Sequence, residues 1–310
     1  MKKGIFFGII GNLFVGFQPI VANSRPQSLD ALIFASMTCL IEAIIFFPIM
    51  LIEIKRKHSK RDNHTSSKEI QLSVLQNWKK NLRLLLVIGV IFGVNQLLFF
   101  VGYQYAGAIN GSLTQKTTVF FSLLFGYIIL KEKITKMQII FSIILFFGLI
   151  LAITQGSFNF LLIGFDAMLG VLILLGMTCL WMYGHAITKP IFNRNEATPI
   201  QMVFLRNILS AIILISAYLI FFPISNFQLL LIPINAFYYV LMGSVYGAGL
   251  VSWYFALSYL DVSVATIIFS PTPIVTAIFA TIILGEAFTV FHMVGTFLVI
   301  LSIYVILKQK

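Results

Sequence analysis

The fold of this chain is decided by a stretch that occurs twice, as LLFGYIILKEKIT at residues 123–135 and as AIFATIILGEAFT at residues 277–289. The two copies lie 154 positions apart, and the match extends back without a gap to Gly89 and Gly243. Such self-similarity at a fixed spacing predicts an internal duplication. The identical pairs are Gly89/Gly243, Gly93/Gly247, Tyr105/Tyr259, Phe125/Phe279, Ile128/Ile282, Ile129/Ile283, Leu130/Leu284, Glu132/Glu286 and Thr135/Thr289.

The composition indicates an all-α integral membrane protein. Of 310 residues, 59% are hydrophobic and 10% are charged, which is more apolar surface than a soluble domain could bury. The apolar residues form unbroken runs of about 20, long enough to span a bilayer as helices, whereas barrel strands would alternate polar and apolar residues. We expect ten transmembrane helices, at residues 4–22, 29–52, 84–105, 110–130, 137–154, 164–187, 199–222, 234–256, 263–284 and 289–307.

The ten expected helices divide into two repeats of five, residues 1–154 and 164–310. Because five is an odd number, the second repeat must enter the membrane from the opposite side, so we expect an inverted repeat, the usual plan of a secondary transporter. The paired glycines form small-xxx-small faces that let helices approach closely. These faces serve either static packing or the sliding of one half against the other. They consist of Gly89 and Gly93 in the first repeat and Gly243 and Gly247 in the second.

The formal net charge of +11 indicates how the chain is oriented in the membrane and does not indicate a nucleic-acid partner. With the amino terminus in the cytoplasm, 18 of the 21 Lys and Arg residues fall on the cytoplasmic side, as the positive-inside rule requires. We therefore expect a multi-pass protein of the cytoplasmic membrane, with both termini and the long loop 53–83 in the cytoplasm. This loop either anchors the topology or contacts anionic membrane lipids.

Three short motifs carry a resemblance to a known family. They are Tyr-Leu-Asp-Val-Ser-Val-Ala from Tyr259, Ser-Pro-Thr-Pro from Ser270 and Leu-Gly-Glu-Ala-Phe-Thr from Leu284. Together they resemble the carboxy-terminal repeat of the EamA family in the drug/metabolite transporter (DMT) superfamily. The first repeat contains a weaker version, and Pro199 followed by Arg206 is a further family feature. The resemblance implies transport of small metabolites, amino acids, sugars or drugs.

Lys116 and Glu42 are the main candidates for substrate chemistry, since charges inside membrane helices are costly and usually functional. Lys116 lies about 9 Å along the expected helix 110–130. It either snorkels to the outer interface or faces a central cavity and contacts an anionic group of the substrate. Glu42 lies near the middle of the expected helix 29–52, where a carboxylate must be paired, hydrated or protonated. It is a candidate for proton coupling, for binding an ammonium group, or for structural pairing.

Other residues are weaker candidates. Trp181, Trp253 and Tyr254 either stack on an organic substrate or pack between helices, and Asn95 and Gln115 suggest a hydrated cavity. For Arg206 we favour snorkelling or an ion pair over substrate contact. The remaining positions concern gating and structure. Pro271 and Pro273 should free backbone carbonyl groups, through either a broken helix near the binding site or a static kink. Glu132 and Glu286 should cap or lock the turn before the next helix.

Two other classes of function compete with a carrier. An intramembrane enzyme would need clustered acids or metal ligands, but no two of the four His residues have ligand spacing, and no nucleotide-binding motif or cofactor motif occurs. A flippase is a closer alternative, because Lys116 would suit an anionic lipid headgroup equally well. We expect a secondary carrier of a small polar or amphiphilic metabolite that works by alternating access and is not an enzyme.

Overall fold

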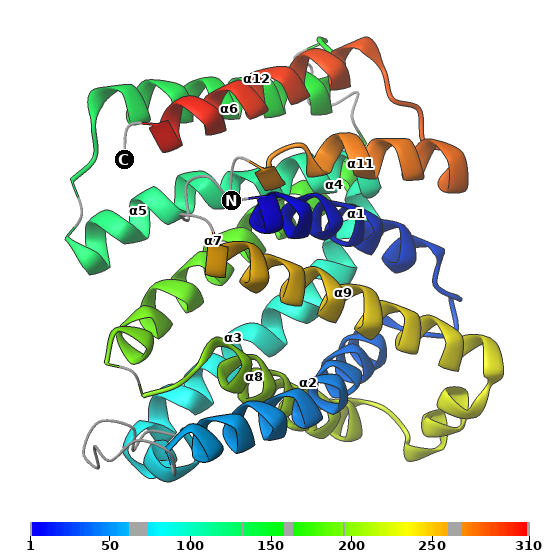
Figure 1. Cartoon of the computed structure of the whole chain (residues 1–310). Helices are drawn as coiled ribbons and strands as arrows, with labels where there is room; N and C mark the ends of the chain where they lie inside the picture. The colour runs from blue at the N-terminus through cyan, green and yellow to red at the C-terminus, as the bar shows by residue number, and fades with distance from the viewer. Residues whose placement is uncertain are drawn as a thin grey trace. The chain divides into compact units, whose positions relative to one another are not determined.

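In a computed structural model, the chain is described at residues 2–61, 74–131, 133–157, 164–194, 196–259 and 268–308. Eight helices in these ranges are long and apolar enough to cross a membrane, and they run through most of the chain (Figure 1). This architecture is that of a multi-pass membrane protein. The eight are α1 (Lys2–Ser24), α2 (Ala31–Arg61), α3 (Val74–Ala106), α6 (Lys136–Thr154), α7 (Phe165–Asn193), α8 (Pro199–Phe221), α9 (Pro233–Tyr259) and α12 (Val290–Lys308).

Two of the expected helices are interrupted instead of continuous. The expected helix 110–130 consists of α4 (Ala108–Thr114), a 3-10 turn (Gln115–Thr117) and α5 (Thr118–Leu130). The expected helix 263–284 is described from residue 268, and its regular part, α11, runs over Thr272–Phe279 before a π-helical turn at Ala280–Leu284. A further 3-10 helix, Ile224–Leu231, connects α8 to α9.

The segment 53–83 was expected as one loop, whereas helices extend into it from both sides. Helix α2 continues to Arg61 and α3 begins at Val74. The reason is that Glu, Lys and Arg are good helix formers, so a helix does not have to end where its apolar run ends.

Helices α6 and α8 begin with the same local device. The side chains of Thr135 and Thr198 each accept a hydrogen bond from the backbone N–H three residues later. The side chain of the Gln at that position accepts a hydrogen bond from the backbone N–H of the threonine. These capping boxes satisfy otherwise unpaired donors at the starts of α6 and α8. In α8 the cap is followed by a proline at the first turn, where a missing N–H has no cost.

The helices form two compact units, and each unit takes residues from both sequence halves. Unit 1 comprises residues 1–26, 98–183 and 248–310, and unit 2 comprises residues 27–97 and 184–247. Helices α3, α7 and α9 contribute to both units.

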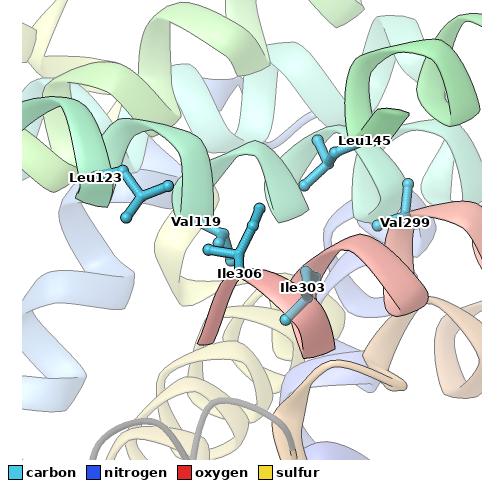
Figure 2. Close-up of a cluster of buried hydrophobic side chains, with 6 residues drawn as sticks. All are labelled: Val119, Leu123, Leu145, Val299, Ile303 and Ile306. Carbon is cyan, nitrogen blue, oxygen red and sulfur yellow. The ribbon is translucent and has the colours of Figure 1, made fainter. Parts of the chain in front are cut away.

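In unit 1, helices α6 and α12 lie side by side (Figure 1). Their closest approach involves Gly148 and Gly295, since a Cβ at position 295 would lie 2.5 Å from the Gly148 carbonyl oxygen. An apolar cluster from α5, α6 and α12 stabilises this arrangement (Figure 2). Its buried members are Val119, Leu123, Leu145, Val299, Ile303 and Ile306.

Unit 1 also contains two pairs of helices from opposite sequence halves. Helix α1 packs on α11, with Gly16 against Val275. The region of α4 packs on α7, where the Thr117 and Thr178 hydroxyl groups are hydrogen-bonded at 2.9 Å.

In unit 2, helix α2 packs along α8 (Figure 1). Gly89 of α3 faces α8, because a Cβ there would lie 2.7 Å from the Leu209 Cβ. Gly243 of α9 faces α2 in the same way, because a Cβ there would lie 2.6 Å from the Ile41 Cβ. The matched glycines therefore make matched contacts, α3 with α8 and α9 with α2.

Candidate substrate site

The candidate residues divide between the two units. Lys116, Gln115, Trp181, Trp253 and Tyr254 belong to unit 1, whereas Glu42 and Asn95 belong to unit 2.

Lys116 lies in the 3-10 turn between α4 and α5. Its ammonium nitrogen Nζ donates a hydrogen bond of 3.0 Å to the backbone carbonyl oxygen of Phe269. The side chain is half-buried, and its charged end is thus directed at the backbone that leads into α11.

Threonine hydroxyl groups bond to the irregular backbone around Lys116. The Thr114 hydroxyl donates to the Asn110 carbonyl oxygen and the Thr117 hydroxyl to the Thr114 carbonyl oxygen, both at 2.8 Å. Such bonds compete with the regular ladder and bend helices. A stretch of 3-10 helix inside a longer helix often marks a hinge.

Prolines explain why the Phe269 carbonyl group is available to Lys116. In a regular helix the amide of residue 273 would donate to this carbonyl, but Pro273 has no N–H. The Thr272 hydroxyl also donates to the Phe269 carbonyl oxygen, and the Asn12 amide donates to the Ile268 carbonyl oxygen. Side chains thus satisfy the carbonyl groups just before α11, which begins directly after Pro271.

Phe269 also organises an aromatic neighbour. The Trp253 ring packs edge-on against the Phe269 ring, with ring centroids 5.0 Å apart. Lys116 and Trp253 are therefore brought together around one residue that the sequence did not single out. The signal that could have identified Phe269 is its position four residues before Pro273.

The other unit 1 candidates are less defined. Gln115 is half-buried, and in the described part of the chain its amide nitrogen Nε2 has no hydrogen-bond partner. Trp181 is half-buried in α7. The side chain of Tyr254 lies outside the described residues.

Unit 2 contains a buried pair of opposite charges. Glu42 of α2 is fully buried, and its Oε2 accepts a hydrogen bond of 3.0 Å from the Asn207 amide. Its other oxygen, Oε1, has no partner among the described residues. Arg206 of α8 is close enough to Glu42 to interact electrostatically.

Arg206 packs inside unit 2 and does not reach its surface, because the residue is 5% exposed. Its guanidinium carbon lies 4.5 Å from the centre of the Phe92 ring, a cation–π contact. The expectation of snorkelling is therefore wrong for Arg206, while the alternative of structural pairing fits its position beside Glu42. Asn207 and Phe92 are partners that the sequence did not predict. Asn95 is buried in α3.

Glu286 caps a helix, but not the one that follows it. Its Oε1 accepts from the Ala108 amide at 2.7 Å and its Oε2 from the Ile109 amide at 2.9 Å, at the start of α4. Gly107, with φ of 79°, allows the turn that exposes these amides. The expected cap before the next helix is thus replaced by a contact between the two sequence halves. Glu132 lies outside the described residues.

In each of the two small-xxx-small faces, the first glycine (Gly89 or Gly243) is tightly packed and the second glycine (Gly93 or Gly247) is not. A Cβ at Gly93 or at Gly247 would lie no closer than 3.5 Å to its nearest neighbour, in contrast to Gly89 and Gly243. Among the residues that the structure describes, no three His, Cys, Asp or Glu side chains are grouped so that they could hold a metal ion.

Membrane-spanning helices with buried charges and a proline-broken segment are typical of one class of protein, the membrane transporters. The family model of the EamA-like transporter family matches residues 2–154 and 168–308. The chain belongs to this family.

Relatives and a solved structure are consistent with that assignment. The chain is 28% identical over 233 residues to the uncharacterized transporter YyaM of Bacillus subtilis (strain 168), covering 73% of each chain. It is 21% identical over 305 residues to an uncharacterized transporter of Methanothermobacter thermautotrophicus, covering 96% of this chain and 84% of the relative. A crystal structure of a protein 13% identical in sequence matches with a TM-score of 0.65, over 98% of this chain and 96% of that one, and it shows the fold alone.

Proposed function

We propose that the chain is a secondary transporter of the cytoplasmic membrane that moves a small polar or amphiphilic metabolite with an anionic group by alternating access. The observation that carries this proposal is the ammonium group of Lys116, which is directed at a proline-broken backbone within a membrane helix. Broken helices at mid-membrane are where secondary transporters bind substrates and ions. Amino-acid-like compounds, acidic sugars and organic anions fit this chemistry.

The proposed architecture is ten transmembrane helices in two inverted repeats, residues 1–154 and 164–310. Counting α4 and α5 as one helix, and α11 with its π-helical turn as part of another, gives five helices in each repeat. The contacts support a two-fold relation, because α3 packs on α8 and α9 packs on α2. In the same way α1 packs on α11, and the region of α4 packs on α7.

A thermal-shift screen of the detergent-purified protein against metabolites identifies the substrate, and Lys116→Gln then tests its binding mode. Loss of one charge-assisted hydrogen bond costs about 1.5 to 3 kcal/mol, which is roughly a 10- to 150-fold loss of affinity. We expect a loss of this size with a melting temperature near that of the parent. The control is Lys136→Gln, since Lys136 is exposed in the first turn of α6. An affinity that changes less than about threefold contradicts the proposed anion contact.

Glu42 is the proposed proton-coupling residue. It is a fully buried carboxyl group with one oxygen bonded to Asn207 and the other without a partner in the described part of the chain. Glu42→Gln keeps the size and the Asn207 contact but cannot titrate. We expect the variant to fold and to lose the pH dependence of reconstituted transport. If the pH profile matches that of the parent, Glu42 has no part in coupling.

The flippase alternative is tested with the same protein. A flippase for an anionic headgroup would move labelled lipid between leaflets of a vesicle, whereas the proposed carrier would move a water-soluble solute. Lipid movement without solute movement contradicts the proposal.

A further inference from the structure

Hydrogen bonds bring together four oxygen atoms from two sequence-distant segments where α11 begins. They are the carbonyl oxygens of Ile268 and Phe269, the Asn12 side-chain oxygen Oδ1 and the Thr272 hydroxyl oxygen, all within unit 1. None of them belongs to an acidic group. Lys116 Nζ contacts this group of oxygens through the Phe269 carbonyl oxygen at 3.0 Å.

Without the Lys116 ammonium, the donors among the described residues would be too few for these oxygens. The single hydrogen of the Thr272 hydroxyl has two acceptors within reach, Asn12 Oδ1 and the Phe269 carbonyl oxygen, and it can serve only one at a time. Pro273 cannot supply the missing donor, because it has no N–H. Within a membrane, carbonyl groups at a broken helix must be satisfied by protein groups or by ions. A positive charge is what completes this cluster.

Neutral oxygens at an unwound helix are the ligands with which transporters hold monovalent coupling ions. We propose that Asn12, Ile268, Phe269 and Thr272 form a monovalent-cation site in which the ammonium group of Lys116 takes the place of a sodium ion. The wild-type carrier then needs no sodium, because its cation is covalently attached. This inference goes beyond the proposed function, since it concerns a cation held within unit 1 and not the transported molecule.

The sequence repeat explains why one tethered cation would be enough. At the spacing of 154 residues, Lys116 of the first repeat corresponds to Ser270 of the second. The ammonium therefore contacts the residue that directly precedes its own counterpart. A single lysine thus joins positions of the two sequence halves that are one residue from equivalent, and the second half carries Ser270 and not a lysine at the matching position.

The test is to remove the ammonium and supply a free cation. Lys116→Ala is purified as the full chain in detergent, and its melting temperature is measured in sodium chloride and in choline chloride of equal ionic strength. We expect the parent to melt within about 1 °C in the two salts. A site with a dissociation constant near 10 mM would gain about tenfold in folded population at about 100 mM sodium, a rise of roughly 2 to 5 °C for Lys116→Ala.

Three variants serve as controls for this measurement. Lys136→Ala removes an exposed lysine and should show no difference between the salts. Lys116→Arg keeps a cation and should also show none. Adding Thr272→Val to Lys116→Ala removes one proposed oxygen ligand, and we expect the sodium effect to fall by at least half.

Equal melting temperatures of Lys116→Ala in sodium and choline overturn the proposal. So does a failure of this variant to fold in both salts, because sodium should replace the missing charge. No transported substrate enters the experiment, and the result therefore stands whether or not the proposed transport function is correct.

Discussion

Lys116 and Arg206 both place a positive charge within apolar helical segments, but their surroundings differ. The compact ammonium of Lys116 points at a single carbonyl oxygen, whereas the flat guanidinium of Arg206 lies over the Phe92 ring. An ammonium is a point charge that suits carbonyl oxygens, and a guanidinium stacks on aromatic faces. The two residues are therefore not interchangeable, and they carry separate roles, one in the proposed binding site and the other beside Glu42.

The buried charges of unit 2 should stabilise each other. Glu42→Gln and Arg206→Gln each leave the remaining charge buried without its opposite charge, so we expect each to lower the free energy of unfolding by about 1 to 3 kcal/mol. The double variant should lose less than the sum of the two, with a coupling of about 1 kcal/mol or more. Denaturation of the purified proteins in mixed micelles measures all three. Additive losses would show that the two charges do not interact.

Glu286 should contribute to stability through the start of α4. Glu286→Ala removes the acceptor for the Ala108 and Ile109 amides, and hydrogen bonds to a charged group are each worth about 1.5 to 3 kcal/mol. We expect a lower melting temperature and faster hydrogen exchange at these two amides. Asp166→Asn, at an exposed acidic residue of α7, is the matched control. Unchanged exchange at Ala108 and Ile109 in Glu286→Ala would contradict the capping role.

At the scale of single residues, the sequence predicts which charges are unusual but not what they contact. Lys116, Glu42 and Glu286 stand out because charges are rare in apolar runs. Their partners are two backbone amides, a backbone carbonyl oxygen and an asparagine side chain. No sequence pattern marks such groups as partners of a particular charge. The Phe269 carbonyl becomes a special acceptor only because Pro273 follows four residues later and the chain brings Lys116 to it.

At the scale of helices, the apolar runs predict where the long helices lie, but not where a helix is interrupted. The 3-10 turn at Gln115–Thr117 contains no Gly or Pro, the residues that usually signal a break. It is associated with threonine hydroxyl groups that bond to the backbone, and such bonds also occur within straight helices. The prolines before α11, in contrast, signal their break in the sequence.

The paired glycines should respond differently to the same substitution. Gly89→Ala and Gly243→Ala place a Cβ within 2.7 Å of a neighbouring side chain, and overpacking of this kind costs about 1 to 3 kcal/mol. Gly93→Ala and Gly247→Ala place it no closer than 3.5 Å, an ordinary contact. Melting temperatures of the four variants in one detergent make the comparison. If Gly89→Ala and Gly93→Ala lowered the melting temperature equally, and Gly243→Ala and Gly247→Ala did so too, close helix approach would not explain why positions 89 and 243 are glycine.

At the scale of the whole molecule, composition predicts membrane insertion and the short motifs predict the family, while the compact units do not follow the repeats. Each unit combines residues from both sequence halves. A sequence comparison finds equivalent segments, but packing joins segments that are complementary, such as α3 with α8 and α9 with α2.

The topology is predicted from the basic residues. Both termini and the segment 53–83 should face the cytoplasm, because 18 of the 21 Lys and Arg residues then lie on that side. Labelling of single cysteines with a membrane-impermeant reagent in intact cells measures this, with a cysteine near Arg25 as the accessible control. An externally labelled carboxy terminus would overturn both the orientation and the even number of helices.

The central claim is that this protein is a secondary carrier, which moves a small anionic metabolite across a membrane without hydrolysing ATP. The most direct measurement is counterflow in proteoliposomes loaded with the compound selected by thermal shift, comparing the parent, Lys116→Gln and Lys136→Gln at equal protein content. We predict saturable, ATP-independent accumulation of labelled compound in the parent and in Lys136→Gln, with the apparent affinity of Lys116→Gln lowered roughly 10- to 150-fold. Accumulation with the same affinity in all three proteins, or no accumulation above protein-free vesicles, would contradict it.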